Sequence, residues 1–393
     1  MTKLRTVLST ICLDSFVFII AVVLGASTAS AADTSDSEPL KLSGDVRVRG
    51  ELDSRDDAES DEKDGSRFRP RLRARISASY QTPVEGISVG IRLATNAGTP
   101  GNSPHQTMDL GSSGTNSIYL DRAFISYDLK ALTEALEGMS LVFGKQAMPL
   151  WGQTEAFWDE DIQPEGAALR IAKGLGSAGK LTIAAGHFYL TNSSWDSDGP
   201  FQNDTLDVWQ VRWNGAFGSI SPTLAFSGLH TSDGGEPSNS DGTNTFGATA
   251  FYMGSIQLKA TFGDAKVVAG FDYHTSTASA DGLDPSAQNG WVGQLRAGYG
   301  RYELRLYQYA IGEASVPFWG TAVLAQDNFP NSNSTAPTGF TGQRVQLGAK
   351  LGKGVSMDAR AYLMKGNDDN MLGFSEAAGR SITRYQLNLN AKF

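Results

Sequence analysis

The stretch RFRPRLRARISASY, residues 67–80, alternates polar and apolar side chains along its whole length. Successive side chains of a β-strand point to opposite faces, so this segment has one apolar face and one face that carries five arginines. A helix would scatter the same arginines around its axis. Two fold classes fit such a strand: a soluble sandwich with the arginines in water, or a membrane barrel whose apolar face meets lipid while the arginines line a wet interior.

The first 31 residues have the pattern of a secretory signal peptide. Lys3 and Arg5 precede a mostly apolar run over residues 7–24, and small residues at positions 29–31 fit a cleavage site. A retained helical anchor is the alternative. Residues 32–41 then form a short lead-in to a barrel over residues 42–393. Cys12 is the sole cysteine and lies inside the signal, so no disulfide, cysteine-bound metal or catalytic cysteine is expected in the mature chain.

Composition favours a barrel over the alternatives. No other stretch reaches the ~18 consecutive apolar residues of a transmembrane helix, so a protein of this kind can cross a membrane only as a closed barrel. Charged residues make up 19% of the chain, below the ~25% of typical soluble domains. The formal net charge of −9 argues against a nucleic-acid partner.

Alternating segments recur to the end of the chain, separated by seven short connections and eight long polar loops. This asymmetry is typical of outer-membrane barrels, which have short periplasmic turns and longer extracellular loops. The sequence therefore predicts an all-β fold, a transmembrane antiparallel up-and-down β-barrel of about 16 strands with both chain ends on the short-turn side. Residues 246–262 are counted as one strand because their alternation keeps one phase.

The ends of the expected strands carry further membrane signals. Aromatic residues gather on the apolar phase near both strand ends, as in the aromatic girdles of membrane barrels. The chain finishes TRYQLNLNAKF, residues 383–393, with Phe393 in phase with the apolar face. This ending resembles the assembly signature of bacterial outer-membrane barrels. Expected partners are therefore the barrel-assembly machinery, through Phe393, together with outer-membrane lipid and lipopolysaccharide.

Three stretches taken together resemble the putative-porin family of Gram-negative outer membranes. They are the arginine strand running into GISVGIRLATN, the segment SIYLDRAFISYDL and the segment FWDEDIQPEGAALR. The resemblance is best over roughly residues 40–175. It implies a passive channel in the outer membrane of a Gram-negative bacterium, and many 16-stranded porins form homotrimers. The acidic first loop departs from the family pattern, and the family name specifies no solute.

The arginines on the polar phase of the first strands are the predicted pore lining: Arg47, Arg49, Arg67, Arg69, Arg71, Arg73, Arg75 and Arg92. A barrel of ~16 strands leaves a wide channel, which something must narrow. The candidate constriction is the third long loop, residues 148–165, which has apolar anchors and four carboxylates: Asp159, Glu160, Asp161 and Glu165.

If this loop folds inward, its carboxylates face the arginines, and opposed charges across a neck sort solutes by charge. The alternative is a surface lid, with the arginines paired to wall carboxylates such as Asp45 and Glu51. In both cases the arginines are in excess, which predicts a mild anion preference. Arg122 is ambiguous because residues 119–127 allow either phase.

Two other candidate sites are less well supported. The acidic first loop, residues 53–64, lacks the spacing of a calcium loop and is more simply a solvated charge run. His187 lies on the apolar phase near the external rim, where barrel lipid hydrolases carry a serine and histidine pair. The neighbouring strand offers no serine there, and no G-x-S-x-G motif occurs. No catalytic residue, metal site or cofactor is predicted.

Two functional classes remain. The first is a diffusion porin. The second is a non-conducting surface barrel that acts as an adhesin or structural outer-membrane protein. Ion conductance in a planar bilayer separates the two.

Overall fold

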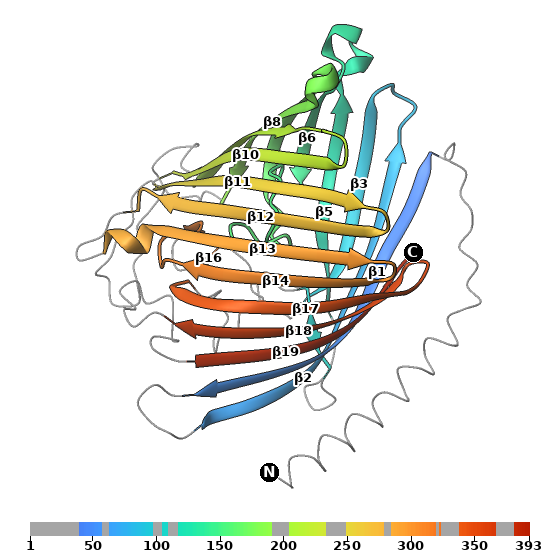
Figure 1. Ribbon diagram of the computed structural model, residues 1–393. Coiled ribbons are helices and arrows are strands. Elements are labelled where there is room, and N and C mark those ends of the chain that lie inside the picture. Colours follow the sequence, from blue (N-terminus) through green and yellow to red (C-terminus); the bar gives the residue numbers. More distant parts are fainter. Residues whose placement is uncertain are drawn as a thin grey trace, which may run out of the picture.

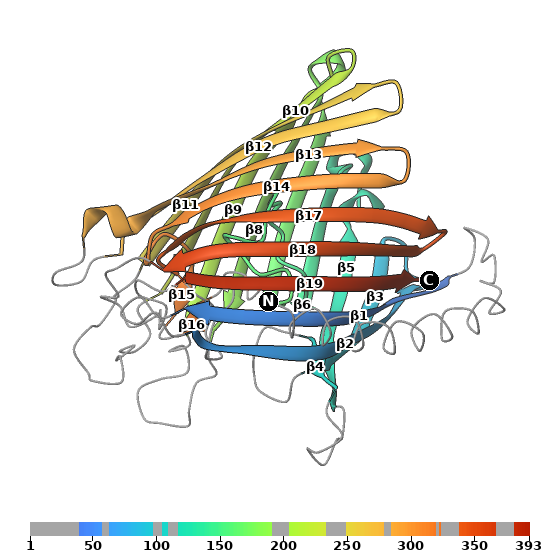
Figure 2. The same cartoon turned by 60° about the horizontal axis from the view of Figure 1, so that its bottom comes forward.

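Sixteen long strands of the described chain form one antiparallel sheet that closes into a barrel (Figure 1). The computed structural model describes residues 39–56, 63–96, 104–108, 117–190, 204–232, 249–278, 284–319, 322–323, 338–366 and 381–393. Strand β1 pairs with β2 on one side and with the last strand, β19, on the other. Figure 2 shows this seam, with β1 between β19 and β2. The predicted fold class is confirmed.

The barrel strands follow one another around the sheet in chain order. The first eight are β1 (Leu40–Asp56), β2 (Lys63–Gln81), β3 (Ile87–Asn96), β5 (Ser117–Asp128), β6 (Met139–Lys145), β7 (Glu165–Gly174), β8 (Lys180–Tyr189) and β9 (Thr205–Asn214). The second eight are β10 (Ile220–Thr231), β11 (Thr249–Phe262), β12 (Ala265–Ser276), β13 (Asn289–Tyr299), β14 (Tyr302–Ile311), β17 (Phe340–Gly352), β18 (Val355–Gly366) and β19 (Ser381–Lys392).

Small elements occupy some of the connections. Strand β4 (Gln106–Thr107) pairs with β2, and β15 (Phe318–Trp319) pairs with β16 (Ala322–Val323). Short 3₁₀ helices are η2 (Leu129–Ala131), η3 (Glu134–Leu136), η4 (Gly176–Ala178) and η5 (Pro285–Gln288). No helix within the described ranges is long and apolar enough to cross a membrane.

Short and long connections alternate as the sequence predicts, and glycines close the tightest turns. Residues 300–301 join β13 to β14, and Gly300 there has a φ of 57°. In the turn between β17 and β18, Gly354 has a φ of 73°, and a Cβ atom on it would lie 2.3 Å from the Lys392 carbonyl oxygen. Glycine alone combines an unstrained positive φ with the absence of a Cβ atom, and Gly354 requires both.

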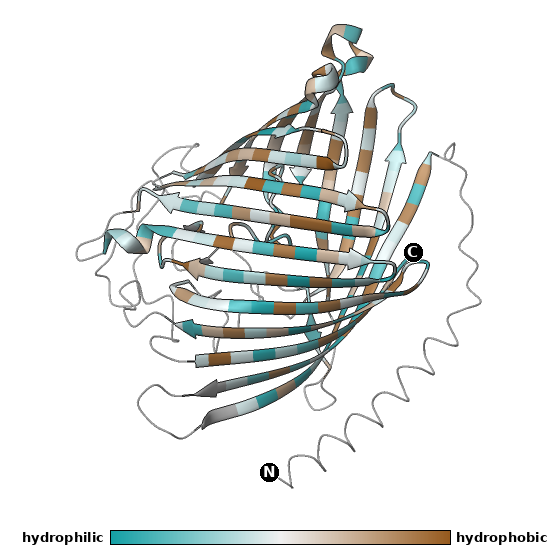
Figure 3. Cartoon of the chain, viewed as in Figure 1, coloured by the Kyte–Doolittle hydropathy of each residue, from teal (hydrophilic) through white to brown (hydrophobic). Residues whose placement is uncertain are grey.

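Hydrophilic and hydrophobic residues alternate along the strands (Figure 3), and they face opposite sides of the wall. On β17, Leu347 points outward and is 60% exposed, whereas its neighbour Gln346 points inward and is 6% exposed. Apolar side chains exposed all around a closed wall are those of a barrel surrounded by lipid. Most aromatic residues expected in the girdles are exposed on this outer wall: Phe68, Tyr80, Tyr189, Phe262, Tyr273, Tyr299, Tyr302, Tyr385 and Phe393.

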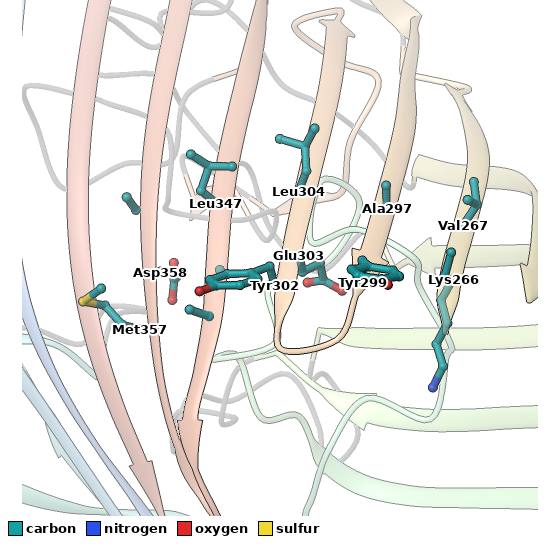
Figure 4. A pocket seen from close by; sticks show the side chains of 15 residues that line it. Lys266, Val267, Ala297, Tyr299, Tyr302, Glu303, Leu304, Leu347, Met357 and Asp358 are labelled. Atoms are coloured by element: carbon teal, nitrogen blue, oxygen red, sulfur yellow. The ribbon is translucent and has the colours of Figure 1, made fainter. Parts of the chain in front are cut away.

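A groove of about 520 Å³ lies near the short-turn ends of β12 to β14, β17 and β18 (Figure 4). Its lining includes Leu304, Leu347 and Met357, and Tyr299 and Tyr302 flank the turn beside it. These side chains belong to the apolar outer wall. The groove therefore suits lipid acyl chains.

One boundary corrects the sequence analysis. Strand β1 continues to Asp56, so Asp53 belongs to the strand and not to the first loop. Asp53 faces inward, is 6% exposed and stands opposite Arg67 and Arg384 in the sheet. These two arginines stabilise the Asp53 carboxylate, which the sequence analysis placed in the solvated acidic loop. Residues 57–62 of the acidic loop lie outside the described residues.

Candidate functional site: the channel lumen

The arginines of β2 face the lumen and meet carboxylates of β1. The register places the two strands so that inward side chains stand opposite one another. Arg73 and Arg75 each lie 2.7 Å from Asp45. Arg69 lies 2.5 Å from Glu51, and Arg67 3.0 Å from Asp53. The pairing proposed as the alternative reading of these arginines is therefore present.

The other wall arginines bond to amides and carboxylates of neighbouring strands. Arg47 donates to Asn390 at 2.6 Å, and Arg49 donates to Asn388 at 2.7 Å. Arg384 lies 2.6 Å from Asp53, and Arg92 pairs with Asp121. Among the described residues, the eight predicted arginines together with Arg384 outnumber the wall carboxylates they meet, which are Asp45, Glu51, Asp53, Asp121 and Asp358. The wall keeps an excess of positive charge.

A β-bulge explains why the phase of Arg122 cannot be read from sequence. Arg92 stands opposite Arg122, but the next residue, Leu93, stands opposite Leu120, so Asp121 is an extra residue in β5. A bulge breaks the strict alternation of a strand. As a result Asp121 and Arg122 both bond to lumen groups, Arg122 by donating to Gln163 at 2.7 Å.

Part of the second long loop also enters the arginine cluster, which sequence reasoning missed. Strand β4 pairs with β2 at Arg71 and Leu72. Just before it, the carbonyl oxygen of His105 accepts a hydrogen bond from Arg71 at 3.1 Å. Burial, together with Arg49, Arg47, Arg71 and Arg73, holds the pKa of His105 well below its usual value. A single histidine in a polar loop gave no signal of this position.

The connection between β6 and β7, residues 146–164, runs inside the ring of strands (Figures 1 and 2). We call it the inner loop. Gln153 in this loop donates to Asp272 on β12 at 2.6 Å and accepts from Gln294 on β13 at 2.7 Å. The backbone of Trp151 exchanges two hydrogen bonds with Gln210 on β9, at 3.0 and 2.8 Å. These contacts hold the loop against the wall formed by β9 to β13.

Apolar contacts reinforce this attachment. Phe157 and Trp158 are 2% and 9% exposed and belong to a cluster of buried apolar residues from the loop and the wall. The Phe157 ring lies 5.3 Å from the ring of His274 on β12. Burying two aromatic side chains stabilises the inward position by about 1.5–3 kcal/mol each. Leu150, a third expected anchor, packs against the same cluster.

Two of the four predicted carboxylates, Asp161 and Glu160, lie near the lumen arginines. Asp161 lies 3.4 Å from Arg75. Glu160 interacts electrostatically with Arg75, Arg122 and Arg73. Burial, reinforced by Glu155, raises the pKa of the Glu160 carboxyl above its usual 4.5, against the effect of these arginines.

The remaining two predicted carboxylates are placed differently. Asp159 is 2% exposed and accepts a hydrogen bond from the backbone of Asp161 at 2.8 Å, so it helps to shape the loop. Glu165 is the first residue of β7 and lies 2.8 Å from Lys145 at the end of β6. Cross-strand pairing therefore takes Glu165 out of the constriction.

An outer-wall pair joins His187 on β8 to Asp207 on β9. Nδ1 of His187 lies 2.7 Å from Asp207, and the two side chains are 53% and 55% exposed. The neighbours of this pair in the sheet are Ala167 on β7 and His230 on β10. Neither offers a hydroxyl nucleophile. Within the described part of the chain, no group of three or more His, Cys, Asp or Glu has metal-binding geometry.

Comparison with known proteins supports the porin interpretation. The profile of the family described as putative porin matches residues 57–215. The resemblance inferred from the sequence is confirmed. That range includes the arginine strand, the second long loop and the whole inner loop. Residues 57–215 of the barrel are thus similar to putative porins, which fits a barrel in the outer membrane of a Gram-negative bacterium.

Solved structures with a similar fold include bacterial porins. A mutant of the Rhodopseudomonas blastica porin is 14% identical and has a TM-score of 0.45, with 90% of this chain and 100% of that chain covered. OmpT of Vibrio cholerae with loop L8 deleted is 12% identical, with a TM-score of 0.49 and coverage of 91% and 100%. The trimer form of OmpT is 13% identical, with a TM-score of 0.48 and the same coverage. No curated protein matches the chain.

Proposed function

We propose that this barrel is a passive diffusion channel for small hydrophilic solutes and ions, with a mild preference for anions. One observation carries the proposal: the inner loop is attached to β9–β13 and also reaches Arg75 on β2 and Arg122 on β5, so it narrows the lumen and leaves the water path beside these contacts. Opposed charges across such a neck select solutes by charge. Because arginines outnumber carboxylates along the lumen, anions are favoured over cations.

Within this proposal the predicted pore-lining residues have distinct roles. Arg75 and Arg122 border the constriction because they contact Asp161 and Gln163 of the inner loop. Arg47 and Arg49 of β1 and the other arginines of β2 extend the positive surface from it toward the long-loop end of the barrel. Glu160 and Asp161 form the acidic side of the neck. No catalytic step is assigned to any of these residues.

The partners proposed for the barrel follow from its outer surface and its strand number. Outer-membrane lipid and lipopolysaccharide would contact the apolar wall and its rim. The assembly machinery would bind the last strand, β19, through Phe393. A homotrimer is proposed from the 16 strands.

Reversal potentials across a KCl gradient in a planar bilayer test the channel and its selectivity. We expect the parent protein to conduct and to prefer chloride. An Arg75→Gln/Arg122→Gln variant should shift the anion-to-cation permeability ratio about twofold toward unity, because two charges leave the neck. Arg301→Gln, at an exposed turn where Arg301 contacts Tyr302, is the matched control and should leave the ratio unchanged.

Each contrary outcome has a separate meaning. An inserted barrel that passes no current would overturn the channel and favour the surface-barrel alternative. A ratio identical in the parent and the double variant would leave the channel standing and refute the anion preference.

A further inference from the structure

Arginines continue along the lumen wall well beyond β1, β2, β3 and β5. Four consecutive strands after β12 each carry one inward arginine: Arg296 on β13, Arg305 on β14, Arg344 on β17 and Arg360 on β18. Each alternates with outward apolar neighbours, such as Leu295 beside Arg296 and Leu304 beside Arg305. We call these four residues the arginine track.

The sheet register places the members of the track next to one another. Arg296 stands directly opposite Arg305. Arg305 stands opposite Gln346, two residues from Arg344, and Gln346 in turn stands opposite Arg360. Same-face residues directly opposite have Cβ atoms about 5 Å apart, and diagonal neighbours about 7–8 Å. Successive guanidiniums are therefore within reach of a single small solute.

The track also climbs through the barrel. Arg296 lies three residues from the short-turn end of β13, whereas Arg360 lies at the middle of β18. The next arginine in the same diagonal direction is Arg384 on β19, three residues from the long-loop end of that strand, and it leads to Asp53 and the arginines of β2. The series thus connects the periplasmic mouth with the long-loop end of the arginine row on β2.

Carboxylates neutralise only part of this charge. Glu303 pairs with Arg296 at 3.2 Å and with Arg305, and Asp358 pairs with Arg360 at 2.6 Å. The Arg344 guanidinium lies 3.7 Å from the centre of the Tyr307 ring, and Glu155 of the inner loop acts on it electrostatically. Four arginines thus face three carboxylates. The side chains of Arg296 and Arg305 are 29% and 32% exposed, so their guanidiniums are accessible from the lumen.

We propose that the arginine track binds and conducts solutes with two anionic groups a few ångströms apart, such as short dicarboxylates, in preference to monoanions. This inference rests on the proposed channel function. Charge-assisted contacts to two neighbouring guanidiniums hold a dianion more strongly than one contact holds a monoanion. A spaced series of such sites lets the solute move from one to the next without a single deep trap.

Block of chloride current by organic anions provides the test. In the parent, the four-carbon dicarboxylate succinate should reduce the chloride current at lower concentration than the four-carbon monocarboxylate butyrate. In Arg305→Gln/Arg360→Gln, the half-blocking concentration of succinate should rise about fivefold while that of butyrate changes little. Arg305→Lys/Arg360→Lys keeps the charge and should remain close to the parent.

Arg170→Gln is the control, because Arg170 is an exposed residue of β7, away from the track. Equal block of the parent by succinate and butyrate would overturn the proposal, as would an unchanged succinate block in the double glutamine variant. If the parent passes no chloride current, it is the channel function itself that fails. If the double glutamine variant does not insert, Arg305→Lys/Arg360→Gln takes its place and is compared with Arg305→Lys/Arg360→Lys. These two variants differ by one charge, and the one with the lower charge should need more succinate for half block.

Discussion

Most lumen arginines are held in place by specific partners on neighbouring strands, and this limits which of them can meet a solute. Arg384 and Asp53, 2.6 Å apart, are both nearly fully buried. Arg49 is 2% exposed and donates to Asn388. Removing one partner of a buried pair costs about 3–5 kcal/mol, so these residues stabilise the wall. Arg75 and Arg122, which reach the inner loop, are the ones placed to act on a passing ion.

Glu160 makes the neck sensitive to pH. Because the pKa of this carboxyl is raised, mainly by burial, it gains a proton at a higher pH than an ordinary glutamate does. Protonation removes a negative charge from the acidic side of the neck. The chloride preference should therefore increase by about twofold on acidification, and the increase should begin at a higher pH than an ordinary glutamate would give, measured as reversal potential in a KCl gradient.

Two variants assign the effect to this residue. Glu160→Gln should show the higher chloride preference already at pH 7 and little further change on acidification. Glu137→Gln, at a periplasmic turn where Glu137 pairs with Lys130, should titrate like the parent. A pH response that survives in Glu160→Gln would assign it to other groups, such as the histidines.

Among the elements, the strands could be predicted from sequence and the inner loop could not. A strand position follows from alternation among adjacent residues, because one face meets lipid and the other meets water. The inner loop is positioned by contacts between residues far apart in the chain: Gln153 bonds to residues 119 and 141 positions away. Its apolar residues predicted that it packs against something, but not which strands. The bulge at Asp121 removed the alternation that would have placed Arg122.

Gln153 is the polar residue on which the attachment of the inner loop depends most. Its side chain bonds to Asp272 and Gln294 at 2.6 and 2.7 Å and to Gln257 at 3.4 Å. Gln153→Ala removes these three hydrogen bonds and a fourth to the Ile256 carbonyl oxygen at 3.4 Å, each worth about 1 kcal/mol net. The displaced state of the loop should then become at least about tenfold more populated.

Single-channel recordings measure this population. We expect brief closures in Gln153→Ala, because the loop moves into the passage, with little change in the fully open conductance. Gln81→Ala, at the end of β2 beside a periplasmic turn, serves as the control. Equal closed-time fractions in both variants would show that the aromatic contacts of Phe157 and Trp158 suffice to hold the loop.

At the scale of the whole molecule, the first and last strands, β1 and β19, meet at the seam that closes the barrel. The backbones of Gly44 and Phe393 exchange hydrogen bonds of 3.0 and 3.1 Å. A Cβ atom on Gly44 would lie 2.4 Å from the Phe393 ring, so the glycine leaves the space in which the ring lies. Phe393 thus contributes to closure in addition to its proposed recognition by the assembly machinery. Because the closed wall has no unpaired strand edge, it separates the charged, water-filled lumen from lipid.

The selectivity of the enclosed lumen should depend on salt, because it comes from the summed field of many charges and not from one tight binding site. The Debye length falls from about 10 Å at 0.1 M salt to about 3 Å at 1 M. The anion-to-cation permeability ratio of the parent should therefore be highest in dilute KCl and approach unity near 1 M. Arg75→Gln/Arg122→Gln should start nearer unity and vary less. A ratio that stays constant over this range would mean that ions shed water and bind at one narrow point, and the distributed excess of arginines would not be the cause of selectivity.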